Sequence, residues 1–158
     1  PIQSGVVTLG KIDGGTIRNV IAGHTRIEGT IRGLTQKMIE TIDQRLKDIC
    51  EGIGRSYNMT VNLELNQGGY WPVENNSELT KRFISYMKST PSVNFIETEP
   101  AMTGEDFGFL LAKFPGTMFW LGVDDDSQLH SATLKPKEEA IQRGVDAITG
   151  FLEYRMTE

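Results

Sequence analysis

The sequence contains a single cysteine, Cys50, among its 158 residues. No internal disulfide is therefore possible, and a reducing cytosol is the expected compartment. No apolar run approaches the roughly 20 residues that a bilayer-spanning helix needs. The opening residues also lack the basic and apolar regions of a signal peptide. These absences predict a cytoplasmic protein that makes no contact with a membrane.

Positive charge is scarce as well. The chain has 16 Lys and Arg against 21 Asp and Glu, a formal net charge of −5 and a pI near 5.1. A nucleic-acid surface needs clustered Lys and Arg, so no nucleic-acid partner is expected. No Gly-x-Gly-x-x-Gly or Walker-type lysine loop occurs, which excludes the common nucleotide fingerprints. Small solutes or proteins are the expected partners.

The first part of the chain predicts two antiparallel strands, a helix and a further strand. The segments Val6–Ile12 and His24–Arg32 are rich in β-branched or alternating residues, and Asp13, Gly14 and Gly15 indicate a turn after the first. Thr35 is the expected cap of a helix that ends at Gly52 and Gly54, and alternation over 61–65 predicts a third strand. These elements make half of a four-strand, two-helix sandwich.

The second part alternates between helices and strands. Residues 67–76 carry the Gly, Pro and Asn residues that break regular structure, so we place a boundary there, with lobes over 1–72 and 73–158. The elements predicted beyond it are helices over 77–87, over 104–114 and from Pro136, and strands over 93–96 and 118–123. The overall fold class is α/β, or α+β, with a parallel or mixed sheet in the second lobe.

The last predicted helix has an apolar stripe at three- and four-residue spacing. Ile141, Val145, Ile148 and Leu152 form this stripe, and we expect it to face inward. Proline in the first turn, at Pro136, costs no helical hydrogen bond.

His130 is the leading candidate for chemistry. It follows the apolar segment 118–123, and the carboxyl ends of strands are where α/β sheets place their sites. Imidazole is a common ligand of zinc-like metals and can carry protons, although a loop histidine without a role is an equal alternative. The neighbouring run Asp124–Asp126 points its carboxylates in different directions, which favours a solvated turn over a metal cluster.

Three other places carry candidate polar groups. Thr103 or Asp106 is expected to cap the helix that follows Gly104, and free N–H groups at a helix start attract carboxylates. Arg32 ends the polar face of its strand, where a guanidinium suits capture of a carboxylate, although a plain surface arginine fits the spacing too. Asn19 is the other polar candidate in the first lobe.

Several short motifs occur in an order that is typical of one enzyme family. They are Val6–Ile12 with Gly14–Gly15, Asn19–Ile21, Gly29–Arg32, Gly104–Phe107, Pro115–Gly122 and Leu129–Ser131. In this order they resemble the amidohydrolase branch of the di-metal aminoacylase and carboxypeptidase family. That branch includes N-acetyldiaminopimelate deacetylases, hippurate hydrolases and indoleacetyl-amino-acid hydrolases.

The resemblance implies a fragment of a longer enzyme. A chain that opens on Pro1, without methionine, fits that expectation. Residues 1–72 match the second half of a lid domain through which family members form homodimers, and residues 73–158 match the last part of a metallopeptidase-like catalytic domain. The general base and the other metal ligands are expected upstream.

The family's site residues carry over to five positions. His130 matches a metal ligand, Asn19 and Arg32 match lid positions that bind substrate, and Gly104 and Glu105 match a loop that borders the substrate. The family often has proline where this chain has Ala22, so the backbone that aims Asn19 is less restricted here.

The implied activity is metal-dependent removal of an acyl group, expected to be acetyl, from an N-acyl amino acid such as N-acetyldiaminopimelate, a step of lysine biosynthesis. Two divalent ions, zinc, manganese or cobalt, are expected in the parent enzyme. The 158-residue chain alone, with one ligand, is expected to bind metal poorly and to be inactive. The alternatives are a non-catalytic dimerisation module of the same family and a small-molecule binding domain that uses the Gly104 loop.

Overall fold

The computed structural model describes residues 5–68 and 70–157. The chain forms two compact units, Pro1–Glu74 with Glu99–Lys113 and Asn75–Thr98 with Phe114–Glu158. Helices and strands occur in both halves of the element order, in agreement with the predicted mixed α/β class. None of the helices in the described ranges is long and apolar enough to cross a membrane.

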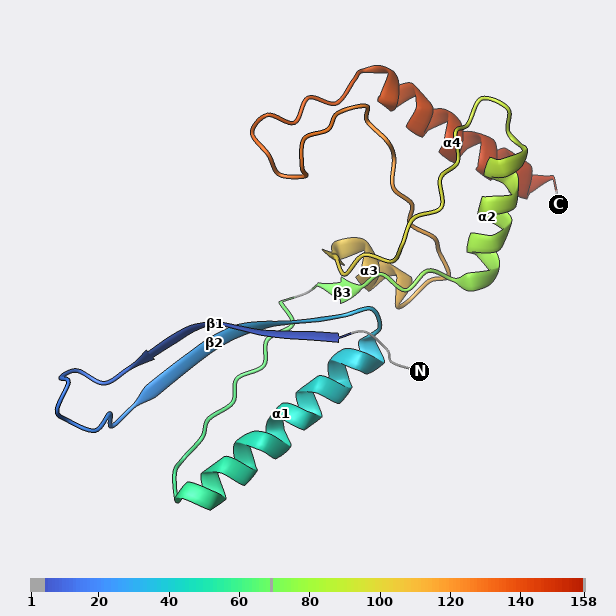
Figure 1. The fold of residues 1–158 in the computed structure, drawn as a ribbon. Helices are drawn as coiled ribbons and strands as arrows, with labels where there is room; N and C mark the ends of the chain where they lie inside the picture. Colours follow the sequence, from blue (N-terminus) through green and yellow to red (C-terminus); the bar gives the residue numbers. More distant parts are fainter. Residues whose placement is uncertain (1–4, 69, 158) are drawn as a thin grey trace. The chain divides into compact units, whose positions relative to one another are not determined.

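A β-hairpin dominates the first unit (Figure 1). Strand β1 (Gly5–Gly14) pairs antiparallel with β2 (Thr25–Gly33), in a register that runs from Gly5 opposite Gly33 to Gly14 opposite Thr25. The two predicted strands are therefore confirmed. A register shift occurs between Leu9 and Lys11, where a bulge adds one residue to β1.

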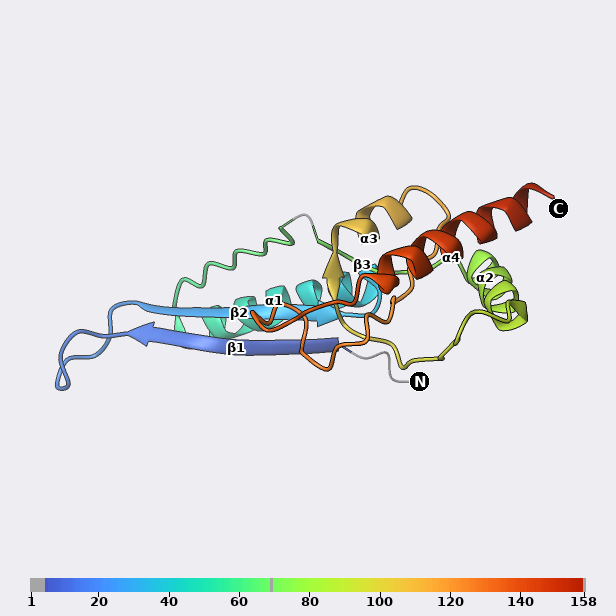
Figure 2. The same ribbon diagram turned by 90° about the horizontal axis from the view of Figure 1, so that it is seen from above.

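Helix α1 (Gln36–Tyr57) begins where the sequence predicts. The Thr35 hydroxyl accepts a hydrogen bond from the Met38 N–H at 3.2 Å, which satisfies one of the free donors of the first turn. The helix contacts both strands of the hairpin, beside which it is drawn in Figure 2. The predicted end is wrong, because α1 continues through both glycines. It ends at Tyr57, and the cap residue Asn58, whose backbone is left-handed (φ 51°), donates its N–H to the Gly54 carbonyl.

A small second sheet completes the first unit. Strand β3 (Trp71–Pro72) pairs antiparallel with β4 (Gly104–Glu105), and helix α3 (Asp106–Leu111) follows directly. The helix predicted over 104–114 is thus shorter than expected, because its first two positions are taken by the β4 ladder. The Trp71 and Phe109 rings meet edge to face at 5.6 Å and hold α3 against β3.

Two helices and an aromatic cluster form the second unit. Helix α2 (Ser77–Ser89) begins at Ser77, where the sequence predicts, and the Asn76 side chain caps it by accepting the Leu79 N–H at 2.9 Å. Its Phe83 packs on Phe151 of α4 (Glu139–Met156), with ring centroids 5.0 Å apart, and on Phe119 at 4.9 Å. These contacts make the core of this unit.

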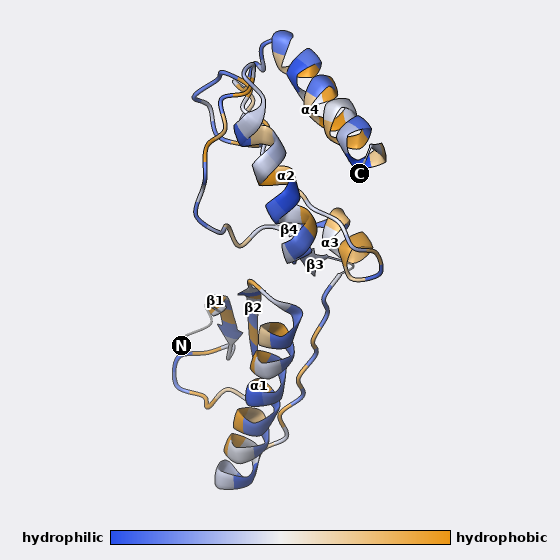
Figure 3. Ribbon diagram, turned by 90° about the vertical axis from the view of Figure 1, so that its right-hand side faces the viewer, coloured by the Kyte–Doolittle hydropathy of each residue, from blue (hydrophilic) through white to orange (hydrophobic). Residues whose placement is uncertain are grey.

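The predicted inward stripe of α4 is wrong. Its four members are all exposed, with Ile141 at 70% of its full accessible surface. The buried residues are instead Ala140, Gly144 and Phe151, one position away from the expected face. A Cβ at Gly144 would lie 3.0 Å from the Leu121 side chain, so small residues and one large ring fit this face better than the branched stripe. Figure 3 shows polar and apolar residues mixed along the helix.

The start predicted for α4 is also wrong, since the helix begins at Glu139 and not at Pro136. The Lys137 N–H donates to the Val123 carbonyl at 3.1 Å, which holds the residues before the helix in a non-helical path.

Three predicted strands, 61–65, 93–96 and 118–123, are not hydrogen-bonded strands in the described residues. Alternation or an apolar run shows which side chains are suited to burial, but a strand also requires a neighbour that accepts and donates main-chain hydrogen bonds. In the last of these segments a side chain serves instead. The Asn75 carboxamide accepts from the Met118 N–H at 2.8 Å and donates to its carbonyl at 2.9 Å.

Candidate functional site

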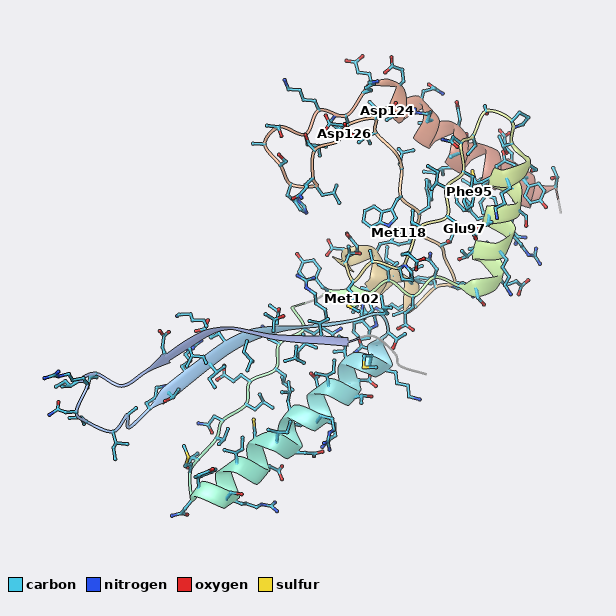
Figure 4. The ribbon with its side chains drawn as sticks, in the orientation of Figure 1. Phe95, Glu97, Met102, Met118, Asp124 and Asp126 are labelled. Carbon is cyan, nitrogen blue, oxygen red and sulfur yellow. The ribbon has the colours of Figure 1, made fainter. Side chains whose placement is uncertain are left out.

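In the first unit the structure brings Arg32 close to the segment that leads into β4. One guanidinium nitrogen of Arg32 donates to the Met102 carbonyl at 3.4 Å, two residues before Gly104. Met102 is labelled in Figure 4. Arg32 is exposed and Glu105 is half-buried. The end of β2 therefore contacts the segment just before β4, which holds two further candidate residues, Gly104 and Glu105.

Asn19 lies far from that region. It is an exposed residue of the loop between β1 and β2, within a turn in which the Val20 N–H donates to the Ile17 carbonyl at 3.2 Å. Arg32 is at the other end of β2. At about 3.3 Å per residue, the path from Thr25 to Arg32 alone spans roughly 23 Å. An amino-acid-sized ligand therefore cannot contact both side chains of one chain.

The cap predicted for the Gly104 loop is wrong. The residue before α3 is Glu105, and its side chain makes no capping hydrogen bond. Neither Thr103 nor Asp106 takes that place, because β4 holds Gly104 and Glu105 opposite β3 and the six-residue helix starts only at Asp106.

His130 lies in the second unit, on the loop between the 118–123 segment and α4. The Ser131 N–H donates to the Gln128 carbonyl at 3.0 Å, which makes a β-turn with His130 as its third residue. The His130 backbone is left-handed there, with φ 66°. The side chain is exposed.

The aspartates beside this loop have defined partners. Asp124 accepts from Arg143 of α4 at 2.7 Å, and this hydrogen bond and charge lower the pKa of Asp124. Asp125 accepts the Ser127 N–H at 2.7 Å and the Lys135 N–H at 3.1 Å. Hydrogen bonds from the Ser127 side chain and backbone lower the pKa of Asp125.

The solvated turn predicted for these aspartates is therefore incomplete, since two of the three carboxylates organise the loop. The Asp-x-Ser spacing at Asp125 and Ser127, typical of an Asx turn, was the local signal for one of these bonds. The bonds to Lys135 and Arg143 have no comparable signal in the sequence.

The described residues do not by themselves form a metal site. Within residues 5–68 and 70–157 no group of three His, Cys, Asp or Glu side chains lies close enough to hold a metal ion. His130 has the right donor chemistry for a zinc-like ion, but Asp124 and Asp125 are engaged with Arg143 and with backbone N–H groups. His130 therefore fits as one ligand of a site that needs further ligands from elsewhere.

A mixed α/β chain with a hairpin-and-helix unit and a histidine on the loop before the last helix is compatible with the amidohydrolase class. Residues 3–154 match the family described as Peptidase family M20/M25/M40, and the chain belongs to this family. The resemblance predicted from the sequence motifs is thereby confirmed.

Curated relatives are much longer than this chain. It is 88% identical over 156 residues to an N-acetyldiaminopimelate deacetylase of Limosilactobacillus reuteri, covering 99% of this chain and 41% of the relative. The same protein of Lactobacillus helveticus is 80% identical over 157 residues, with the same coverage. That of Pediococcus pentosaceus is 59% identical over 158 residues. The chain thus spans about 41% of the length of the relatives it matches.

Two solved structures share the fold. A protein from methicillin-resistant Staphylococcus aureus described as an aminohydrolase matches 94% of this chain and 39% of its own, with a TM-score of 0.82 and 28% identity. A Bacillus subtilis protein described as a dinuclear metal-binding peptidase of the M20 family matches 93% of this chain and 40% of its own, with a TM-score of 0.78 and 22% identity.

Proposed function

We propose that these residues are the carboxyl-terminal part of a metal-dependent amidohydrolase that removes the acetyl group from N-acetyldiaminopimelate. The observation that carries the proposal is the 88% identity over 156 residues to a protein of that name. An identity this high across both units supports the same substrate class.

The proposed roles are assigned in each unit separately. Residues 1–72 belong to the lid and residues 73–158 to the catalytic domain. Arg32, with Gly104 and Glu105 nearby, is the substrate-binding region of the first unit, where a guanidinium suits a substrate carboxylate. His130 is a metal ligand in the second.

Two divalent ions of the zinc, manganese or cobalt kind supply the activated water in such a hydrolase. Because His130 is the single ligand that we assign within the described residues, no hydrolytic step is assigned to this chain alone.

The position of Asn19 supports a homodimer. If Asn19 and Arg32 both serve substrate, their separation along the hairpin requires two different sites, and two subunits provide them. The hairpin also exposes apolar side chains that association would cover, among them Leu9 at 61% and Ile12 at 66%. We propose a cytoplasmic homodimer that associates through the lid.

The second candidate is a non-catalytic dimerisation module. The lack of a three-ligand group in the described residues favours it for the isolated chain. It requires no upstream catalytic segment, whereas the amidohydrolase requires one.

The test is an acetate-release assay with N-acetyldiaminopimelate and Mn²⁺ or Zn²⁺, run on the longer gene product and on the 158-residue chain. We expect turnover by the longer protein, a loss of at least 100-fold in His130→Ala, and no turnover by the short chain. Turnover of the longer protein on other acyl amino acids alone would contradict the substrate, and no turnover at all would favour the module.

A further inference from the structure

One carboxylate holds together the base of the loop that carries His130. The two oxygens of Asp125 accept from the Ser127 N–H at 2.7 Å and from the Lys135 N–H at 3.1 Å. These donors lie on opposite sides of His130 in the sequence, so Asp125 joins the outgoing and returning arms of the loop. The Lys137 N–H, which donates to the Val123 carbonyl at 3.1 Å, adds a second closure at the same end.

Asp124 ties this base to α4. Its carboxylate accepts from Arg143 at 2.7 Å, and both side chains are about half exposed. An exposed ion pair contributes little to global stability. Its effect here is geometric, because Arg143 is fixed on a helix and Asp124 is next to the residue that closes the loop. Figure 4 labels Asp124 on this loop.

Hydroxyl groups continue the connection toward the tip. The Ser127 and Thr133 hydroxyls lie 3.2 Å apart, and those of Thr133 and Ser131 lie 2.7 Å apart. Ser131 follows His130 and closes its turn on Gln128. A chain of hydrogen bonds thus leads from Asp125 to the backbone on each side of the histidine.

The conformation at the tip needs this support. A non-glycine residue with positive φ is disfavoured by contacts of its Cβ with the backbone. His130, at φ 66°, therefore depends on the surrounding bonds to stay in its turn. If the base opens, the backbone of His130 is no longer held in this turn.

We propose that Asp125, supported by Asp124, is a positioning residue for His130. Asp125 acts through the loop backbone and not through contact with the imidazole. Its hydrogen bonds hold the loop in the conformation that places His130 at the tip. This inference rests on the proposed function only for its consequence, metal ligation. Groups that orient metal ligands typically contribute about 10-fold to 100-fold in metal affinity, so a loss of about 10-fold is expected on breaking the brace.

The chain offers a matched control. Asp126 is exposed and makes no hydrogen bond or ion pair within the part of the chain that the structure describes. Asp126→Asn removes the same charge from the same loop as Asp125→Asn. In Asp125→Asn the amide oxygen still accepts one hydrogen bond. The NH₂ group faces a backbone N–H donor, so the other of the two hydrogen bonds that Asp125 accepts is lost.

The first measurement is amide hydrogen exchange of the 158-residue chain. We expect faster exchange at Ser127, Ser131 and Lys135 in Asp125→Asn, a smaller increase in Asp124→Asn, and unchanged exchange in Asp126→Asn. Unchanged exchange in Asp125→Asn would overturn the brace, whatever the function of the protein.

The second measurement is Zn²⁺ affinity of the longer protein, by competition with a chromogenic chelator well below the thermal midpoint, so that stability alone does not alter it. The Zn²⁺ affinity should fall about 10-fold in Asp125→Asn, by less in Asp124→Asn, and by less than about twofold in Asp126→Asn. Faster amide exchange in Asp125→Asn together with a wild-type Zn²⁺ affinity would show that Asp125 does not position His130. Wild-type affinity in His130→Ala would instead overturn the ligand assignment in the proposed function. If Asp125→Asn does not fold, Asp124→Asn decides by the same criteria.

Discussion

The β1–β2 hairpin with α1 and the α2–α4 pair are held by different interactions. The hairpin is a main-chain ladder interrupted by one bulge, with every residue of β1 exposed. The helix pair has few main-chain links and is centred on Phe83, Met87 and Phe151, which are 8% exposed or less. Main-chain hydrogen bonds stabilise the first region, and side-chain packing stabilises the second.

This difference predicts which substitutions each region tolerates. A main-chain ladder is destabilised by a substitution that adds a Cβ where a neighbouring backbone passes close by. A side-chain core is sensitive to truncation. The first two of the following predictions compare a side-chain core with a backbone contact, and the last two concern the loop that carries His130. All four use the 158-residue chain.

The largest expected effect is in the aromatic core. Phe151→Ala removes the ring that packs on Phe83 and should lower the free energy of unfolding by about 3–5 kcal/mol. Ile148→Ala, on the stripe that the sequence predicts to be buried, should change it by only about 0.5 kcal/mol. Urea denaturation of both variants checks this. Equal losses would mean that α4 packs through the other face.

The next effect concerns a backbone contact. A Cβ at Gly108 would collide with the Trp71 carbonyl, so Gly108→Ala should cost about 1–3 kcal/mol and separate α3 from β3. Gly52→Ala meets nothing within 4 Å in the interior of α1 and should stabilise by about 0.5–1 kcal/mol. Thermal unfolding of the pair measures both. A stable Gly108→Ala would contradict the close approach.

A smaller effect is expected at the loop tip. His130→Val places a β-branched residue at φ 66°, whereas asparagine adopts this region more readily. Valine should therefore be less stable than asparagine by about 1 kcal/mol. Equal thermal midpoints for the two variants would show that the turn is not held in the left-handed conformation.

The smallest effect is a pH dependence. The pKa of Asp125 in the folded chain is below its ordinary value of 3.8, so its contribution to stability is complete above that pH and is lost as the pH falls through the folded value. The difference in thermal midpoint between wild type and Asp125→Asn should be constant from about pH 8 to about pH 5 and shrink below about pH 4. A difference that grows on acidification would contradict this sign.

Local signals identified most elements of the first region. Strand alternation over 24–32 and the Thr35 cap depend on nearest neighbours along the chain, and both are found in the structure. The end of α1 was missed, since glycine weakens a helix by only about 1 kcal/mol and does not by itself end one. The left-handed cap at Asn58 is the actual end.

Local sequence patterns did not predict which residues pack or hydrogen-bond together across the chain. The two apolar faces of α4 are one residue apart, and the spacing of its residues does not say which one meets α2. Of the candidate site, the motif order identified the family, and the five candidate residues stay predictions. The bonds of Asp125 to Lys135 and of Asp124 to Arg143 span 10 and 19 positions and could not be seen.

The sequence by itself determined the mixed class, the hairpin, the beginning of α1 and membership of the M20/M25/M40 family, because these depend on short patterns and on ordered motifs. Tertiary structure decided the buried face of α4, the contact of Arg32 with Met102 and the hydrogen bonds of Asp125 beneath His130. Those features arise from contacts between residues far apart in the chain. A short sequence pattern does not give the free energy of such a contact.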